Sequence, residues 1–412
     1  MTAIIGWQND LVASAAPLID GEILGAVEEE RFTRVKQPTG FPGRSVTWLL
    51  ESMGLSTAEV DEWVHGWFAG TNMAQMLPDV ARRVAAASNP DGVDAMARRL
   101  ATEHANDVEI RDVGYRLAVE HGVLASRLEA YEHHLSHAWS AHAYSPFDTS
   151  IVVTFDSRGD RKSSTLSRAG GGGIEELEWR SSIDSPGHVY RWVTHVLGYR
   201  TNRHEGKVTG LAGRGRGDEA KEFLRTPIDC RDSLVTAQPG RRFIPTDKGI
   251  PDKTRRQMLG FSAPDLAAGG QDLTEEIVCG FVADRAARLG ERNVVLAGGW
   301  FANVQLNRRS RELPEIDGDF VRPNMGDSGL ALGAAASAWF RRTGEPKVRC
   351  ADMYLGPEPG ADPSGAAIRD TLNPRLNRHE EPIVLTIGDG LAALADGTVD
   401  AVVDRVNDWT TS

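Results

Sequence analysis

The chain has 412 residues, of which 41% are hydrophobic and 25% are charged, the proportions of an ordinary globular protein of roughly two or three domains. With 58 acidic against 46 basic residues the net charge is -12, which argues against nucleic-acid binding. Cys230, Cys279 and Cys350 lie too far apart in the sequence for a zinc ribbon or a disulfide framework. No apolar run is long enough to span a membrane and the N-terminus lacks a signal peptide, so we expect a cytoplasmic protein without membrane contact.

β-Branched and apolar residues predict a meander of short strands at the N-terminus, with a turn at Asp20-Gly21. Apolar residues then recur at helical spacing, and a later stretch rich in Ala, Arg and Asp predicts a helical insertion. In chain order the expected elements are strands over 2–7, 15–19 and 23–28, a helix over 44–53, a strand over 60–68, the insertion near 74–123 and a helix over 127–144.

A second meander of apolar strands starts at residue 150, and helices again follow it. The repeated pattern predicts two α/β lobes, 1–148 and 149–345, and then a linker and short tail over 346–412. The stretch 223–270 shows no clear periodicity. The expected elements are strands over 150–155, 163–168 and 174–179, helices over 189–197 and 273–289, a strand over 293–297, a helix over 329–341, and in the tail a strand over 383–386 and a helix over 391–396.

Four of the 11 histidines fall between residues 133 and 142, in EHHLSHAWSAHA. On a helix, His133 and His137 share one face, a spacing that lets two imidazoles bind one cation. His134 and His137, three residues apart, are the competing pair. Asp327, in NMGDSGLALGAAA, is a candidate third ligand, although an aspartate at a helix start is equally well explained as a capping residue.

Three glycine-containing turns are candidates for phosphate binding. Asp156 opens the turn DSRGD after a strand, and Gly298 and Gly299 follow another strand. A third run begins at Glu205 and contains Lys207. Each turn offers donors to an anion, and each is also explained as a hairpin or a tight turn. The GxxxxGK[ST] pattern of a P-loop is absent from the sequence.

Six segments, taken together, resemble one family. In chain order they are EEERFTRVK (28–36), HHLSHA (133–138), the strand ending at Asp156, EGKVTGLA (205–212), GGWFANVQLN (298–307) and DSGLALGAAA (327–336). Their order and spacing resemble the NodU/CmcH-type O-carbamoyltransferases, which include enzymes that carbamoylate aminoglycoside and cephalosporin-type antibiotics. The resemblance implies the α/β, actin/Hsp70-like (ASKHA) two-lobed fold shared with the catalytic subunit that makes threonylcarbamoyl-adenosine in tRNA.

The resemblance also implies roles for single residues. In that family a divalent metal, often iron, is bound by the residues matching His133, His137 and Asp327, with the aspartate matching Asp156 nearby. Fe(II) is favoured, and Mn(II) and Zn(II) also suit such ligands. Taken by itself, Lys36 is explained as part of a solvent-exposed run of charged residues. In the resemblance it matches a lysine of the acyl-transfer pocket, so Lys36 and Asp156 are the predicted catalytic residues. The residues expected to face ATP or an adenylate are Glu205, Lys207, Gly298, Gly299 and Asn303.

The sequence departs from the family pattern at several places. The chain ends about where a C-terminal YrdC-like domain, which forms carbamoyl adenylate from ATP and carbamoyl phosphate, would begin, and its FGPRALG-type motif is absent. The family's N-terminal HDASAAL appears here as LVASAAP, so Leu11 stands for a histidine of the transfer pocket and Val12 for an aspartate. Gln37 and Ser157 also replace a usual histidine and a usual glycine.

These observations predict an enzyme that moves a carbamoyl group from carbamoyl adenylate to a hydroxyl of a small molecule, in natural-product and antibiotic biosynthesis. A separate YrdC-like protein would supply the adenylate, and the sequence is compatible with an oligomer. Two alternatives stay open: a divergent ATP- and metal-dependent enzyme that activates another acyl group, and a non-catalytic partner that binds nucleotide. They stay open because leucine at position 11 can neither accept a proton nor hydrogen-bond an incoming hydroxyl.

Overall fold

The computed structural model of the protein describes residues 1–68, 72–86, 90–226, 228–231, 234–237, 250–351 and 353–357. The chain divides into two units, Met1–Gly356 and Pro357–Ser412, and the fold described here is that of the first. The strand and the helix predicted over 383–386 and 391–396 lie outside the described residues. Among the described helices, none is long and apolar enough to cross a membrane.

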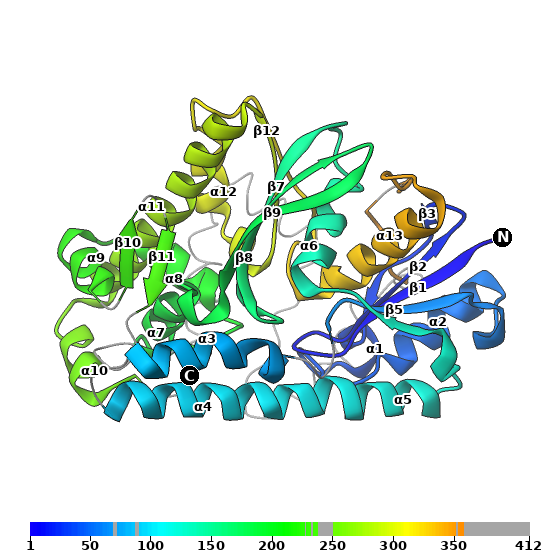
Figure 1. Ribbon diagram of the computed structural model, residues 1–412, viewed down its shortest axis with the longest axis horizontal. Coiled ribbons are helices and arrows are strands. Elements are labelled where there is room, and N and C mark those ends of the chain that lie inside the picture. Colours follow the sequence, from blue (N-terminus) through cyan, green and yellow to red (C-terminus); the bar gives the residue numbers. More distant parts are fainter. Residues whose placement is uncertain are drawn as a thin grey trace, which may run out of the picture. The chain divides into compact units, whose positions relative to one another are not determined.

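Two mixed sheets with the same strand order organise the described part of the chain (Figure 1). In each, the first three strands form an antiparallel meander, and two later strands run parallel to the first. This duplication confirms the α/β, actin/Hsp70-like fold that the resemblance implied. The first sheet has the order β3 (Glu22–Ile23), β2 (Ser14–Ile19), β1 (Ala3–Gln8), β5 (Glu62–His65), β6 (Leu128–Ala130), with β4 (Val27–Glu28) paired to β2; the second has the order β9 (Gly173–Ser181), β8 (Lys162–Gly170), β7 (Ser150–Gly159), β12 (Asn293–Ala297), β13 (Gly318–Val321).

The second sheet is buried on both faces, and apolar residues dominate the buried parts of its strands β7 and β12. Alternate side chains of β7 point to opposite faces. Val152 packs with alanines of α6 (His133–His142), and Val153 packs with phenylalanine and valine side chains of α11 (Ala263–Leu289). The two helices therefore cover opposite faces of this sheet.

The first sheet is covered in the same way. Ile4 of β1 packs with α13 (Leu330–Thr343), and Ile5 packs with α2 (Gly43–Met53) on the other face. Because α13 also contacts α6, these two helices form the layer between the sheets (Figure 1). Helix α13 belongs in sequence to the lobe predicted over 149–345 but packs on the first sheet, and the lobe boundaries remain predictions.

A helical hairpin occupies the region in which an insertion was predicted near 74–123. Helices α3 (Asn72–Ala86) and α4 (Pro90–Asp107) pack together, and α4 continues through a π-helical segment, Val108–Val113, into α5 (Gly114–Glu120). Figure 1 shows α4 and α5 as one long rod that passes beneath both sheets. The remaining elements are α1 (Glu30–Thr33), α7 (Gly187–Val196), α8 (Glu205–Ala212), α9 (Asp218–Arg225), β10 (Ile228–Arg231), β11 (Leu234–Ala237), α10 (Asp252–Met258) and α12 (Val304–Arg311).

The prediction of a helix over 127–144 was wrong for its first residues. Residues 128–130 form strand β6, which pairs with β5, and α6 begins only at His133. The Glu132 side chain caps the helix by accepting a hydrogen bond from the Leu135 N at 2.7 Å. The local helical pattern could not show that a neighbouring strand was available for pairing.

Helix α11 begins at Ala263, well before the predicted start at 273. The Ser262 hydroxyl caps it, as it accepts a hydrogen bond from a first-turn backbone N. The glycines near its start obscured the helical pattern in the sequence. Close packing explains why a glycine stands there. A Cβ on Gly269 would stand 2.6 Å from the Cβ of Ala220, because α9 crosses α11 closely at this point.

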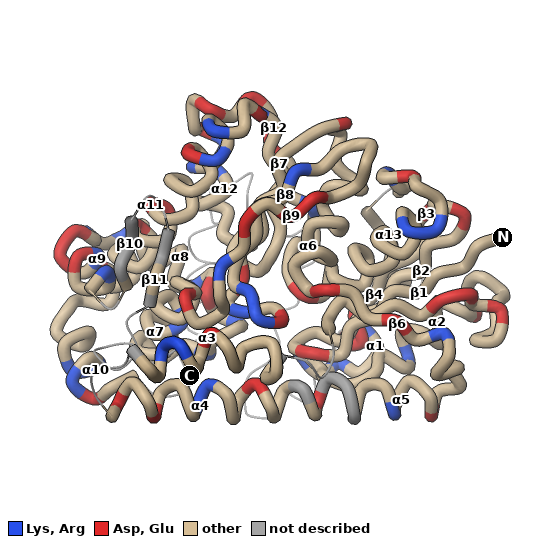
Figure 2. Tube along the Cα trace, viewed as in Figure 1, with Lys and Arg blue, Asp and Glu red and all other residues tan. Residues whose placement is uncertain are grey.

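Charged residues are spread over the described elements, and Figure 2 shows acidic and basic positions interspersed along the trace. On α4, for example, Asp94 pairs with Arg98 on the solvent-exposed side. Exposed pairs of this kind contribute only about 0.3–0.5 kcal/mol each, so they do little to select the fold. The absence of nucleic-acid binding remains a prediction.

Helix α13 fits between its neighbours because glycine stands at both close contacts. A Cβ on Gly333 would overlap the carbonyl oxygen of Ser136 in α6. On the other side, a Cβ on Gly6 of β1 would overlap the carbonyl oxygen of Ala331. Both contacts are between backbones, so neither can be relieved by turning a side chain.

Replacing Gly333 by alanine should therefore destabilise the protein. We expect Gly333→Ala to lower the free energy of unfolding by about 3 kcal/mol, because α6 and α13 must separate and this exceeds the gain in helix propensity. Urea denaturation measures the change. Gly171→Ala is the matched control, since a Cβ there meets nothing within 4 Å and the expected change is within about 0.5 kcal/mol. Equal stability of the two variants would contradict this packing.

Candidate functional site

Four ligand-type side chains meet where α6, β7 and the start of α13 converge. His133 and His137 lie on the first turns of α6. Asp156 lies within β7, and Asp327 directly precedes α13. One ligand atom from each of the four lies within 4.8 Å of the others. The Nε2 of His137 is 3.5 Å from each carboxylate, and the Nε2 of His133 is 4.0 and 3.8 Å from them.

The beginning of α6 places both histidines. The carboxylate of Asp160 accepts a hydrogen bond from the His133 backbone N at 2.7 Å, which ties the helix start to the end of β7. The four-residue spacing then brings the rings of His133 and His137 to a centroid distance of 4.6 Å. His134 turns away, with its Nδ1 2.6 Å from the hydroxyl of Thr154. Of the two histidine pairs left open by the sequence, the structure therefore brings together His133 and His137.

Burial and charge set the protonation of the site. All ring nitrogens of His133 and His137 are buried without a hydrogen-bond partner among the described residues. Burial opposes protonation, yet the carboxylates of Asp156 and Asp327 raise the pKa of His137 to about 9. Burial likewise opposes ionisation of Asp156, yet the two imidazoles hold its carboxyl pKa well below the usual range. Buried imidazole nitrogens that make no hydrogen bond and face two carboxylates fit a divalent cation such as Fe(II), Mn(II) or Zn(II).

Two glycines allow these groups to come close. A Cβ on Gly159 would overlap the His133 ring. Gly298 has a φ of +100°, and a Cβ there would overlap a carbonyl oxygen of β7. This close passage brings the Gly299 N to 3.0 Å from the carboxylate of Asp156, to which it donates a hydrogen bond. The Gly298-Gly299 turn thus fixes a ligand of the cluster.

A cavity of about 380 Å³ lies beside the four ligands, and Asp156 and Asp327 form part of its wall. Its size is in the range of small-molecule sites. Tyr190 and Trp300 contribute aromatic surface to the wall, and Arg203 contributes positive charge. Tyr190 and Arg203 lie outside every motif recognised in the sequence, so the sequence could not identify them. Trp300 directly follows the Gly298-Gly299 pair and belongs to the segment GGWFANVQLN, from which it could have been predicted.

Three of the residues predicted to face a nucleotide line this cavity: Glu205, Gly299 and Asn303. Glu205 opens α8, a helix where the sequence suggested a glycine-rich loop, and its carboxylate accepts a hydrogen bond from the Asn202 N at 2.6 Å. Asn303 caps α12 with its side-chain oxygen. The contact of Asn303 with a nucleotide remains a prediction.

The other predicted residues lie outside the cavity wall. Gly298 acts through its backbone, as described above. The Lys207 ammonium lies 5.8 Å from the centre of the Tyr199 ring. Lys36, with 61% of its side chain exposed, pairs with Glu30 at 2.6 Å. The structure does not bring Lys36 to the cluster of His133, His137, Asp156 and Asp327, and its catalytic role and the nucleotide contact of Lys207 remain predictions.

The positions that depart from the family pattern line the same cavity. Leu11 and Gln37, together with Asn202, form part of the wall and have left-handed φ values of 47°, 51° and 62°. That conformation costs roughly 1–2 kcal/mol for most residues other than glycine. The Gln37 side chain donates a hydrogen bond to the Asn202 carbonyl at 2.7 Å and so joins two distant segments across the cavity. Strained backbone concentrated in one place is typical of functional sites.

Comparison with known proteins decides the family. The family described as carbamoyltransferase N-terminus matches residues 4–229 and 242–336. The chain belongs to this family. The match confirms the resemblance to NodU/CmcH-type carbamoyltransferases, and all four ligand residues of this carbamoyltransferase-family chain lie inside the matched ranges.

Two curated relatives match over a similar extent of the chain. Nodulation protein NolNO of Sinorhizobium fredii is 30% identical over 362 residues, 84% of this chain and 49% of that protein. An uncharacterized protein of Synechocystis is 29% identical over 380 residues, 87% of this chain and 61% of that protein. The chain thus spans less than two thirds of the length of either relative.

Among solved structures, component A of the (R)-2-hydroxyglutaryl-CoA dehydratase of Acidaminococcus fermentans is 13% identical with a TM-score of 0.44, covering 81% of this chain and 96% of that one. HypF of T. kodakarensis is 13% identical with a TM-score of 0.42, covering 86% of this chain and 49% of that one.

Cation binding should release about one proton at pH 7, since His137 must lose its proton to become a ligand. Because the pKa of His137 is raised to about 9, the competing proton is lost only as the pH rises toward that value. The apparent affinity for Mn²⁺ should therefore rise by up to about tenfold per pH unit below the pKa and level off above it. Calorimetric titration in two buffers of different ionisation enthalpy measures the proton release.

Two variants test this assignment. His137→Ala should abolish the proton release, whereas His134→Gln, on the same helix but bonded to Thr154, should retain it. An affinity that does not change between pH 7 and 9 would show that His137 is not a proton-competing ligand.

Proposed function

We propose that this chain transfers a carbamoyl group from carbamoyl adenylate to a hydroxyl group of a small molecule, in natural-product biosynthesis. The observation that carries the proposal is that Asp156 and Asp327 belong both to the ligand cluster and to the cavity wall. A group bound in the cavity would therefore lie next to the cation. Membership of the carbamoyltransferase N-terminus family supports carbamoyl as the group transferred.

In the proposed step the hydroxyl oxygen bonds to the carbamoyl carbon, and the bond from that carbon to the adenylate phosphate oxygen breaks. AMP leaves with the electron pair, and the hydroxyl loses its proton. The pKa of Asp156 is held well below its usual range, so this carboxylate serves as a ligand rather than as a proton acceptor. Leu11, which lines the cavity, has no basic atom either. We therefore assign the proton to the departing phosphate or to water.

The four ligand residues would hold Fe(II), with Mn(II) or Zn(II) also suited to this set. When bound, the cation supplies Lewis-acid polarisation of the carbamoyl carbonyl or neutralises charge on the leaving phosphate. The chain itself keeps the ligands in place: the Gly299 N holds the carboxylate of Asp156, and Asp160 holds the backbone of His133. Ligands fixed before the reaction need little reorganisation during it.

The cavity wall supports an adenylate as the donor. Tyr190 and Trp300 present aromatic surfaces of the kind on which a purine base packs. Arg203 offers a guanidinium suited to a phosphate, and the Glu205 carboxylate can accept hydrogen bonds from ribose hydroxyls. ATP binding would use the same features.

A separate YrdC-like protein would form the carbamoyl adenylate from ATP and carbamoyl phosphate. We further propose that the enzyme is cytoplasmic, that its partners are the YrdC-like protein and a small hydroxyl compound, and that it binds neither nucleic acid nor a membrane. Self-association would be compatible with this arrangement.

Purified protein loaded with Mn²⁺ should release AMP from synthetic carbamoyl adenylate, faster in the presence of hydroxyl compounds than without them. His133→Ala should reduce the release by about 100-fold or more, since it removes a ligand of the cation. Chromatographic quantification of AMP, corrected for the non-enzymatic rate, measures this.

His142→Asn is the matched control, because His142 lies on the same helix but its Nδ1 contacts the Ser150 hydroxyl at 3.2 Å. It should retain the full rate. A protein that binds Mn²⁺ without releasing AMP would contradict the proposal. ATP consumption with an acceptor acid and without carbamoyl phosphate would point instead to another acyl activation, and nucleotide binding without turnover to a non-catalytic partner.

A further inference from the structure

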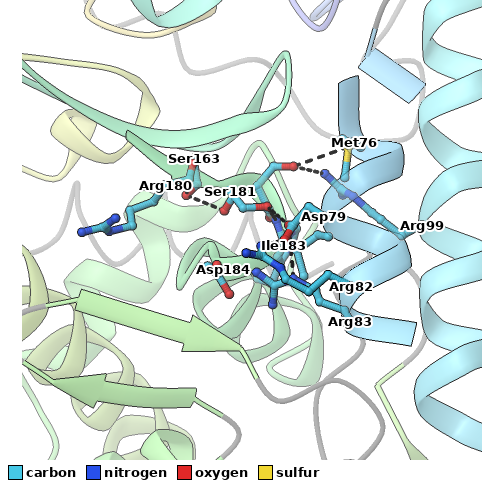
Figure 3. Close-up of polar contacts among 12 residues, drawn as sticks. Met76, Asp79, Arg82, Arg83, Arg99, Ser163, Arg180, Ser181, Ile183 and Asp184 are labelled. Atoms are coloured by element: carbon cyan, nitrogen blue, oxygen red, sulfur yellow. Dashed lines mark hydrogen bonds and ion pairs between the residues drawn. The ribbon is translucent and has the colours of Figure 1, made fainter. Parts of the chain in front are cut away.

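The helical hairpin α3–α4 is anchored on the second sheet by charged side chains (Figure 3). Arg83 of α3 donates to the carboxylate of Asp184 at 2.6 Å, just beyond β9. Arg99 of α4 donates to the hydroxyl of Ser182 at 2.9 Å. The hairpin leaves the first sheet after β5 and rejoins it at β6, so these contacts link an insertion in the first sheet to the edge of the second.

From Arg99 the ionic contacts continue into the interior. Arg99 and Glu103 lie one turn apart on α4, are 1% and 0% exposed, and pair at 2.7 Å. The second carboxylate oxygen of Glu103 is 3.3 Å from a guanidinium nitrogen of Arg158. Arg158 in turn is 3.9 Å from the carboxylate of Asp10, in the loop between β1 and β2. Glu103 is therefore a counter-charge shared by two arginines, one on the insertion and one on β7.

Arg158 is linked to the ligand His133 through the ring of Trp67. Its guanidinium faces the ring of Trp67 at 5.7 Å, and the Trp67 ring meets the His133 ring edge-on at a centroid distance of 4.3 Å. The next residue, Phe68, donates its backbone N to Asp160, the same carboxylate that accepts from the His133 N. The segment leading into the insertion thus contacts the ring of His133 directly and its backbone indirectly, through Asp160.

We propose that Glu103 is a positioning residue for the metal centre: its carboxylate holds Arg158 against Trp67, and Trp67 sets the ring orientation of His133. The inference rests on the metal site of the proposed function and extends it by giving the helical insertion a role. Metal-binding histidines usually have the second ring nitrogen fixed by a hydrogen bond. The Nδ1 of His133 has no such partner among the described residues, so packing by Trp67 takes over that task.

Glu103→Gln keeps the shape of the side chain and removes its charge. In this variant Arg99 retains its hydrogen bond to Ser182, and Arg158 retains its ion pair with Asp10. The negative charge that holds the two guanidinium groups together is lost. Arg158 is then drawn toward Asp10 and away from the Trp67 ring. Looser packing around His133 should weaken cation binding about 10- to 100-fold, the usual effect of losing an indirect support of a ligand.

The test is titration of the full chain with Co²⁺, with the visible absorption spectrum and the affinity as readouts. Glu103→Gln should weaken binding by the stated factor and change the absorption bands, which report ligand geometry. Arg98→Gln, on the exposed side of the same helix, is the matched control and should leave both readouts unchanged. Asp184→Asn removes one of the two carboxylates that pair with Arg83 and should lower the thermal midpoint without altering the spectrum.

The outcomes separate the two proposals. If the unaltered protein does not bind Co²⁺, the proposed metal site fails. If it binds, and Glu103→Gln matches it in affinity and spectrum, the positioning role of Glu103 alone is overturned. Should Glu103→Gln not fold, Arg158→Lys replaces it, because lysine keeps the charge opposite Glu103 but lacks the flat face toward Trp67. An unchanged spectrum in Arg158→Lys would overturn the proposal equally.

Discussion

The contact between the backbones of α6 and α13 determines the geometry of the ligand cluster. At Gly333 the two helices meet with no side chain between them, and Gly6 lets α13 approach β1 in the same way. Interhelical distances depend on the side chains at the crossing, and glycine permits the shortest. The helix starts that carry His133, His137 and Asp327 are thereby brought together. Ligand atoms a few ångströms apart are thus a consequence of core packing.

The duplicated strand order explains where these helices come from. Helix α6 follows β6, the last strand of the first sheet, and α13 follows β13, the last strand of the second sheet. They are equivalent elements of the two repeats, placed back to back. Each repeat therefore carries an incomplete ligand set, and the cluster exists only where the repeats meet. The insertion α3–α4, which belongs to one repeat alone, adds contacts across this junction.

Features that depend on local periodicity were predictable from the sequence. The meanders follow from strand alternation, and the proximity of His133 and His137 follows from helical spacing alone. Their meeting with Asp327 depends on helix packing far along the chain; the sequence offered Asp327 as a candidate ligand or as a capping residue, and the family resemblance favoured the ligand. The left-handed conformations of Leu11 and Gln37 carry no signal in the sequence, and the Asn202 carbonyl that the Gln37 side chain contacts lies far along the chain. The false extension of α6 toward residue 127 has the same origin, since strand β6 needs its partner β5.

The origin of the ligands has a mechanical consequence. His133 and His137 precede the second sheet in the chain, whereas Asp156 belongs to it and Asp327 follows it. The cation proposed for this cluster, bound by all four, would cross-link the repeats without a covalent bond. Its binding energy would add to the packing that holds the repeats in place. A chelator would act on this molecule as a reductant acts on a disulfide, by loosening one half from the other.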